Sequence, residues 1–204
     1  MPRRLMLTVH LLVTITIAGC GLPPATARVE VNPKIANLGI KTIAILPFEG
    51  APVEKEIEDR FGFLQINHPN NGETISDMLA TELMGVGGFD YIERSQIRKV
   101  LEEQGFSLAD LVHKKSASEI GRLVGADGVV LGAVGKARQW TSLTGPGCEL
   151  TFSARMIHTQ TGIVLWSASV TRREGTEDVW QIARQECKYI AEQVRAKLPS
   201  KPTQ

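Results

Sequence analysis

Strict alternation of apolar and polar residues marks two neighbouring strands in the second half of the chain. Over residues 150–156 and again over 164–170, every second side chain is apolar, and most of those between are Ser, Thr or Arg. The stretch 159–162, Thr-Gln-Thr-Gly, separates the two runs and is typical of a tight turn. This pattern predicts a β-hairpin with one apolar face that must be covered and one polar face that meets water or a partner.

The residues before this hairpin predict strands of other kinds. Residues 128–136 and 41–48 are mostly apolar, which is typical of strands buried on both faces. A short strand is expected at 89–93. Residues 28–31 alternate in polarity and predict a small edge strand, with ordered coil as the alternative.

Apolar residues at helical spacing predict four helices. The first covers 73–86, the second is capped by Ser95, and the third starts with a capping box at Ser116. The last opens with the acidic stretch at 176–178, which suits the positive end of a helix dipole.

The last helix carries the clearest apolar stripe. Its predicted buried residues are Val179, Ile182, Ala183, Cys187, Ile190, Ala191 and Val194. Strands and helices together predict an α+β fold, a mixed α/β sandwich in which helices pack on one face of a largely antiparallel sheet. With 204 residues, 43% of them hydrophobic, the chain can bury the core of one domain.

The first twenty residues have the pattern of a secreted lipoprotein. Arg3 and Arg4 precede an apolar stretch over 5–18, which is shorter than the roughly 20 residues of a membrane-spanning helix and fits a signal peptide. Ile-Ala-Gly-Cys at 17–20 resembles the bacterial lipobox, in which the cysteine accepts a diacylglycerol thioether. The alternative is an ordinary signal peptide with a chance cysteine.

Lipidation of Cys20 would tie the chain to a membrane, because two or more acyl chains give stable anchoring. Gly21 follows the cysteine, and by resemblance to enterobacterial lipoproteins this implies sorting to the outer membrane, facing the periplasm. The expected division is a signal peptide at 1–19, the lipidated cysteine and a tether at 20–37, the folded domain at 38–198 and a tail at 199–204.

Charge and motifs argue against nucleic-acid binding and against catalysis. Without Arg3 and Arg4, 21 basic residues stand against 22 acidic ones, whereas a nucleic-acid partner favours a basic face. No histidine stands at a metal-ligand interval from another histidine or a cysteine, and no phosphate-loop or nucleophile motif is present. We therefore expect no enzyme activity, no cofactor and no metal. Asp127 is expected in a helix-to-strand turn, and His158 is expected to be solvated.

Two cysteines remain once Cys20 is set aside. Cys148 begins a predicted strand, and Cys187 lies on the predicted buried face of the last helix. In an oxidising periplasm they could form a disulfide that clamps helix to sheet. Two buried free thiols are the alternative, and the sequence does not choose between them.

Four segments carry a resemblance to a known family. They are Lys-Thr-Ile-Ala-Ile-Leu-Pro-Phe at 41–48, Tyr-Ile-Glu-Arg at 91–94, Gly-Ala-Asp-Gly-Val-Val-Leu-Gly at 125–132, and 154–166, which ends in Thr-Gly-Ile-Val-Leu-Trp. In this order and spacing they resemble the curli-assembly lipoprotein family (CsgG/HfaB type). Its relatives include the Pel-polysaccharide export lipoprotein, penicillin-binding-protein activators and the amino-terminal domain of TolB.

The resemblance gives a meaning to the long connection at 49–72, which has no clear period. In the curli secretion channel, the segment between the first long strand and the first helix lines the pore constriction. Phe61, Phe63, Leu64 and Asn67 are therefore candidate partner-contact residues. The alternative is that the apolar side chains fold back onto the core as a satellite cluster.

The chain departs from the channel-forming members in one respect. Those members insert two long hairpins per subunit, each of about 20 or more residues, and the gaps at 140–149 and 159–162 cannot hold them. We therefore expect no transmembrane hairpins and a resemblance to the barrel-less members, some of which form soluble rings. The candidate ring contact consists of Ser153, Arg155, Ser167 and Ser169, and the alternative is a plain solvated face.

By resemblance, the expected function is that of a non-enzymatic assembly or transport accessory for an exported polymer or surface structure. Its partners would be the membrane, through the lipid anchor, the envelope proteins of an export or cell-wall complex, and further copies of itself. The alternative is a regulator that binds a periplasmic enzyme such as a peptidoglycan synthase, and an enzyme is the distant third. About 20 residues separate Cys20 from the strand at Lys41, which favours a place near the membrane.

Overall fold

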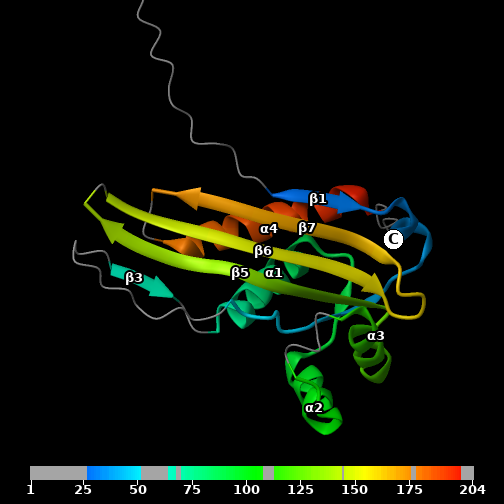
Figure 1. Ribbon diagram of the computed structural model, residues 1–204. Helices are drawn as coiled ribbons and strands as arrows, with labels where there is room; N and C mark the ends of the chain where they lie inside the picture. Colours follow the sequence, from blue (N-terminus) through cyan, green and yellow to red (C-terminus); the bar gives the residue numbers. More distant parts are fainter. Residues whose placement is uncertain are drawn as a thin grey trace, which may run out of the picture.

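The computed structural model describes residues 27–51, 64–67, 70–107, 113–143, 145–175 and 178–198. The leader with Cys20, and Phe61 and Phe63, lie outside these ranges. Within them the chain forms a seven-stranded sheet (Figure 1). Its strands are β1 (Arg28–Val31), β2 (Thr42–Ile45), β3 (Leu64–Asn67), β4 (Asp90–Tyr91), β5 (Gly128–Ser142), β6 (Gly145–His158) and β7 (Val164–Glu174).

The strands follow the order β1-β7-β6-β5-β2-β4, and β3 pairs with the far end of β5. β2 runs parallel to both β4 and β5, whereas the other pairs are antiparallel. The expected α+β fold with a largely antiparallel sheet is therefore confirmed. The strand at 28–31 also exists, as edge strand β1 beside β7.

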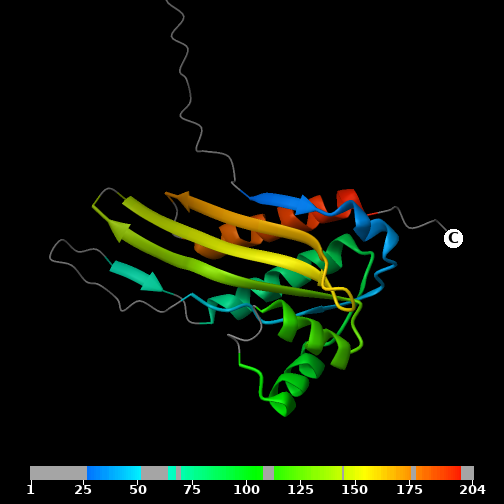
Figure 2. The same ribbon diagram turned by 45° about the vertical axis from the view of Figure 1, so that its right-hand side comes forward.

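The helices are α1 (Asn71–Val86), α2 (Arg94–Gln104), α3 (Lys114–Leu123) and α4 (Val179–Lys197), and a short 3-10 helix covers Pro33–Asn37. α1 and α4 contact each other and bury the main core against one face of the sheet. Figures 1 and 2 show this pair extending along the sheet, while α2 and α3 group together at one end.

The expectation that helices pack on one face holds for α1 and α4 and is wrong for α2 and α3. The latter two form a second core with Ala44 and Leu46 near β2, with Val129 and Leu131 of β5 and with Ile157 of β6. The reason lies in the continuous apolar runs: strands that are apolar on both faces need a covering layer on each side.

The sequence predicted correctly that these helices exist, but it placed the first residues of α2 and α3 too late. Ser95 and Ser116 lie inside α2 and α3, whose N-cap positions are held by Glu93 and His113 without a side-chain hydrogen bond. Asp178 does cap α4, because its side chain accepts hydrogen bonds from the backbone N–H groups of Trp180 and Gln181. The whole predicted stripe of α4 is buried.

β5 and β6 are longer than their alternating pattern indicated. They pair from Gly128 with His158 out to Ser142 with Gly145, so the gap at 140–149 consists of strand ends and a tight turn. A register shift between Val134 and Lys136 interrupts the ladder. None of the helices in the described ranges has the length and apolar content needed to cross a membrane.

Candidate interaction surface

The outer face of the sheet is formed by the side chains of β5, β6 and β7 that point away from α1 and α4. The four candidate ring-contact residues lie together there, because Ser153 pairs with Ser169 and Arg155 pairs with Ser167 across β6 and β7. Three of the four are exposed, and Ser167 is partly exposed. The predicted alternation thus places all four on one surface.

A shallow hollow of about 340 Å³ opens on this face. Glu49, Arg155, Ser153 and Ser167 supply its polar lining, and Gly132 and other small residues supply its floor. Gly132 has to be small, since a Cβ there would lie 2.5 Å from the carbonyl oxygen of Ser153 and 2.8 Å from the ring of Phe48.

A second group of polar side chains lies nearer the β5–β6 turn. Arg138, Glu149 and Arg173 form one row across three strands, since Glu149 pairs with both arginines in the sheet register. The Glu149 carboxylate accepts hydrogen bonds from Lys136 Nζ at 3.0 Å and from Arg138 Nε at 2.9 Å. Burial raises the pKa of Glu149, but these two cations outweigh that effect and hold the pKa below its ordinary value.

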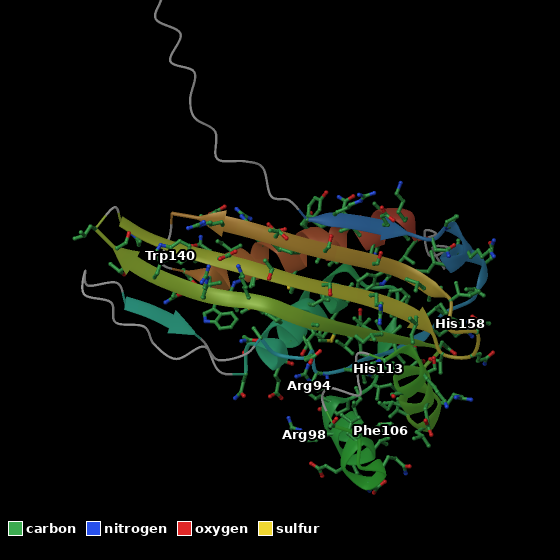
Figure 3. The ribbon with its side chains drawn as sticks, in the orientation of Figure 1. Arg94, Arg98, Phe106, His113, Trp140 and His158 are labelled. Atoms are coloured by element: carbon green, nitrogen blue, oxygen red, sulfur yellow. The ribbon has the colours of Figure 1, made fainter. Side chains whose placement is uncertain are left out.

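Trp140 lies one step further toward the turn. Its ring occupies the space above Gly147, where a Cβ would come within 2.4 Å of the indole. The guanidinium carbons of Arg173 and Arg138 lie 5.0 Å and 5.9 Å from the ring centroid, which is cation–π distance. Figure 3 shows Trp140 and His158 at opposite ends of the sheet.

Sequence analysis missed this second group, although a signal was present. Lys136, Arg138 and Trp140 continue the two-residue alternation directly after the apolar run of β5. Extending the strand along that alternation would have placed all three on one face.

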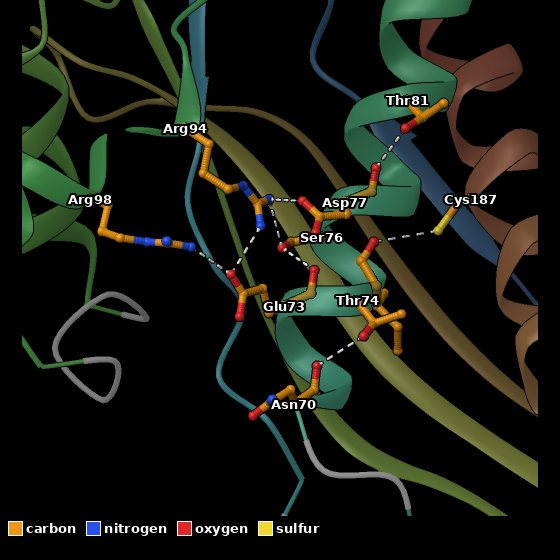
Figure 4. A network of polar contacts seen from close by, with 10 residues as sticks. Asn70, Glu73, Thr74, Ser76, Asp77, Thr81, Arg94, Arg98 and Cys187 are labelled. Atoms are coloured by element: carbon orange, nitrogen blue, oxygen red, sulfur yellow. Dashed lines mark hydrogen bonds and ion pairs between the residues drawn. The ribbon is translucent and has the colours of Figure 1, made fainter. Parts of the chain in front are cut away.

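The contact between α1 and α2 was also missed. Arg94 forms an ion pair with Asp77 at 2.5 Å and donates to Ser76 Oγ at 3.1 Å, and Arg98 pairs with Glu73 at 3.0 Å (Figure 4). The signal was a pair of acidic residues on one helix, Glu73 and Asp77, and a pair of basic residues on the next, Arg94 and Arg98. Within each pair the two residues are four positions apart. A groove of about 440 Å³ beside these residues is lined by apolar side chains, Phe106 among them, and by the charged side chains of Glu73, Arg94, Arg98 and Glu102.

The candidate partner-contact segment is described only in part. Leu64 and Asn67 are the ends of β3, which pairs antiparallel with Arg138–Thr141 of β5. Phe61 and Phe63 lie outside the described residues. The structure therefore places half of the segment at the edge of the sheet, beside the Trp140 end of the outer face.

Cys148 and Cys187 are both buried and both free in the structure. The Cys187 thiol lies 3.9 Å from the carbonyl oxygen of Ile75, and Cys148 pairs with Glu174 across β6 and β7. Burial raises the pKa of Cys187 to about 12 and also raises the pKa of Cys148, which favours the protonated thiol at both positions.

Two other predicted positions have structural roles. Asp127 accepts hydrogen bonds from the N–H groups of Lys41 and Thr42, each at 3.0 Å, and these bonds lower its pKa. The expectation for His158 was wrong: it is only 8% exposed, and its Nδ1 lies 2.8 Å from Thr161 Oγ1. The tight turn brings the Thr161 hydroxyl against the ring.

Among the described residues, no three His, Cys, Asp or Glu side chains are grouped so as to hold a metal ion. The chemistry of the outer face is that of hydroxyl, guanidinium and indole groups, which suits binding. Trp and Arg are the side chains most often found at the centres of protein interfaces.

Comparison with known proteins identifies relatives of this domain. The sequence model of the family described as "Curli production assembly/transport component CsgG" matches residues 63–193. A search of curated protein sequences gave no match. PelC from Paraburkholderia phytofirmans, solved as a dodecamer, is similar with a TM-score of 0.55 and 17% identity, covering 84% of this chain and 97% of PelC.

Two further solved structures share the fold. Lipoprotein GNA1162 from Neisseria meningitidis has a TM-score of 0.54 and 14% identity, covering 76% of this chain and 99% of its own. The hypothetical protein CT253 from Chlamydia trachomatis has a TM-score of 0.50 and 13% identity, covering 80% of this chain and all of its own. At these identities the three structures establish a common fold and nothing beyond it.

Proposed function

Because the chain belongs to the CsgG family of curli production assembly/transport components, we propose that it is a non-enzymatic accessory in the assembly or export of a polymer or surface structure. In this proposal Cys20 carries the lipid that anchors the protein to the outer membrane, and the domain faces the periplasm. The chain acts by holding other envelope proteins, or copies of itself, in place.

The outer face of the sheet carries this proposal. A sheet of seven strands has one face buried along its length by α1 and α4, while the described helices cover only one end of the other face. The uncovered part presents Ser153, Arg155, Ser167 and Ser169 in two cross-strand pairs. Short hydroxyl side chains and a guanidinium can hydrogen-bond a partner without burying an unpaired carboxylate.

A ring of identical subunits is the assembly that this face would build. PelC, which shares the fold, was solved as a dodecamer, and this supports the choice of a ring over a simple dimer. Closed rings need a heterologous contact, in which one surface of a subunit meets a different surface of the next. The β3 edge, with Leu64 and Asn67 and the neighbouring Phe61 and Phe63, is our candidate for a contact with a further envelope protein.

Anchoring is tested by metabolic labelling with radioactive palmitate, followed by separation of the membranes on a density gradient. We expect label in the protein, loss of label in Cys20→Ala, and a position of the wild-type chain in the outer-membrane fractions. An unlabelled protein that washes off the envelope would contradict the anchor and with it the proposed location.

Ring formation is tested by sedimentation across micromolar concentrations. We expect Arg155→Glu on the outer face to lower the mass of the assembly, because it replaces a guanidinium hydrogen-bond donor of the candidate contact with a carboxylate that can only accept. Arg184→Glu, a change of the same charge on the exposed side of α4, is the matched control and should leave the mass unchanged. A wild-type chain that sediments as a monomer would reject the ring.

A further inference from the structure

The sheet ends on one side in the two-residue strand β4. Asp90 donates its N–H to the carbonyl oxygen of Lys41 at 2.7 Å. Ile92 donates its N–H to the carbonyl oxygen of Ile43 at 3.0 Å. Because backbone groups alternate in direction along a strand, the N–H and C=O groups of Tyr91 point away from β2. No strand within the described part of the chain pairs with this outer edge.

A groove of about 430 Å³ runs beside this edge. Helix α1 lines it with Asp77, Ala80 and Met84, and the β4 side lines it with Tyr91 and Glu93. Met84 is 50% exposed, so the apolar part of the groove is open to solvent. Ligand sites in proteins measure about 300–1,000 Å³, and the groove therefore has room for the side chains of a bound chain segment.

The ion pairs around the groove leave one carboxylate over. Arg94 pairs with Asp77 at 2.5 Å and lies 3.7 Å from Glu73, while Arg98 pairs with Glu73 at 3.0 Å (Figure 4). These two guanidinium groups balance two carboxylates. Glu93 is exposed, and no cation of the described residues pairs with it. A cation on a bound segment would therefore be attracted to Glu93.

The Tyr91 side chain gives a separate sign that this edge is incomplete. Its ring packs against the main core, and its hydroxyl oxygen is buried without a hydrogen-bond partner among the described residues. A buried hydroxyl without a partner costs free energy, and an added chain could supply the missing partner. The shortness of β4 disfavours pairing with the edge of another sheet, so a single short segment suits it better.

We propose that this groove binds an extended, cationic segment of a partner protein, which adds to β4 as an antiparallel strand. One partner residue exchanges both of its main-chain hydrogen bonds with Tyr91. Its side chain is apolar and enters the groove beside Ala80 and Met84, on the same side of the sheet as the Tyr91 ring. The partner residue two positions earlier is Lys or Arg and meets the Glu93 carboxylate.

The recognised pattern is thus a cation, any residue and an apolar residue, in that order. Main-chain hydrogen bonds supply affinity in such strand addition, and the alternate side chains supply specificity. The site uses neither the lipid on Cys20 nor the outer face of the sheet. A failure of the proposed anchor or ring therefore leaves it unaffected, and its own failure leaves them unaffected.

The test follows two backbone amides of the full-length protein in detergent micelles. Tyr91 and Tyr189 are the only tyrosines of the sequence, so a chain labelled with isotopic tyrosine gives two amide signals in NMR spectra. Tyr189 lies inside α4, where the helical hydrogen bond already protects its N–H group, and it serves as the internal control.

The probe is the peptide Ser-Lys-Thr-Val-Ser-Thr, blocked at both ends. One matched peptide carries Glu in place of Lys, and another carries a methyl group on the Val nitrogen, which removes the donor to the Tyr91 carbonyl. Glu93→Lys is the variant at the site. Glu119→Lys, the same change at an exposed position of α3, is the matched control.

We expect the Lys peptide to slow hydrogen exchange of the Tyr91 amide by about tenfold or more, because a paired edge is protected from water, and to leave Tyr189 unchanged. The methylated peptide should bind about fivefold more weakly, since it loses one main-chain hydrogen bond. Glu93→Lys should weaken binding of the Lys peptide by about threefold and strengthen binding of the Glu peptide, whereas Glu119→Lys should change neither.

Peptide binding that leaves the Tyr91 amide unprotected would overturn strand addition, and so would equal binding of the methylated peptide. Equal affinity for the Lys and Glu peptides would overturn the cationic partner. Without peptide, protection of Tyr91 that grows with protein concentration would assign the edge to a second copy instead. Protection that disappears when residues 199–204 are removed would assign it to the chain's own tail, which also contradicts the proposal.

Discussion

The two faces of strand β6 differ in burial, chemistry and neighbours. Toward α1 and α4 it presents the buried residues Cys148, Leu150, Phe152, Ala154 and Met156. Toward the outside it presents Glu149, Thr151, Ser153 and Arg155, which are partly or fully exposed. The first set determines how the chain folds, because burying apolar area is the main driving force for packing. The second set contributes less to folding, through contacts such as those of Glu149 with Lys136 and Arg138, and its exposed members can contact a partner.

The same contrast applies to the tryptophans on either side of the sheet. Trp166 of β7 is 1% exposed and belongs to the main core, whereas Trp140 of β5 is half-buried on the outer face. Packing in the main core fixes Trp166, whereas two guanidinium groups contact Trp140. Making the same substitution once on each face therefore measures how much each face contributes to the free energy of unfolding.

The largest expected effect comes from the tryptophan pair. Trp166→Ala removes the largest fully buried side chain and leaves a cavity, so we expect a loss of about 3–5 kcal/mol in the free energy of unfolding. Trp140→Ala should cost about 1 kcal/mol, since it removes surface contacts and cation–π attraction. Urea titration of the purified variants measures both. Equal losses would show that the outer face is part of the core.

Glycine positions give an intermediate effect. In Gly132→Ala the new Cβ meets a backbone carbonyl of β6 and a buried ring, neither of which can move away, so we expect a loss of about 1–3 kcal/mol. In Gly147→Ala the obstacle is the Trp140 side chain, which can turn toward solvent, and the loss should stay under about 1 kcal/mol. Thermal unfolding of the two variants in parallel measures the difference, and a larger loss at Gly147 would contradict a rigid inner face.

The smallest expected effect is the pH dependence of the Glu149 cluster. Its pKa is lowered in the folded chain, so the carboxylate adds stability above the ordinary glutamate pKa of about 4.3 and loses it as the pH falls through the folded value. Glu149→Gln should therefore cost about 1 kcal/mol at pH 7 and progressively less below about pH 4. Urea titrations at pH 7, 5 and 3.5 measure this, and a cost that is constant with pH would mean that the charge does not matter.

Much of the candidate surface could be predicted from sequence. Because side chains alternate along a strand, Ser153 and Arg155 had to share a face, and so did Ser167 and Ser169. Their pairing across β6 and β7 did not follow from the turn at 159–162 alone, because a register shift between Met156 and Ile157 lies between the turn and these pairs. The row of Arg138, Glu149 and Arg173 could not be derived in this way, because the shift between Val134 and Lys136 changes the register before the row is reached.

Sequence alone determined most of the strands and helices and which face of each is apolar, since these properties follow from the spacing of neighbouring residues along the chain. It did not predict β3, which lies in the stretch without a clear period. The tertiary structure alone decided that β2 lies between β4 and β5, that β3 joins the far end of β5, and that α2 and α3 cover one end of the second face. It also brought Arg173 onto Trp140. These arrangements depend on contacts between residues far apart in the chain, whose free energy comes from packing the whole domain at once.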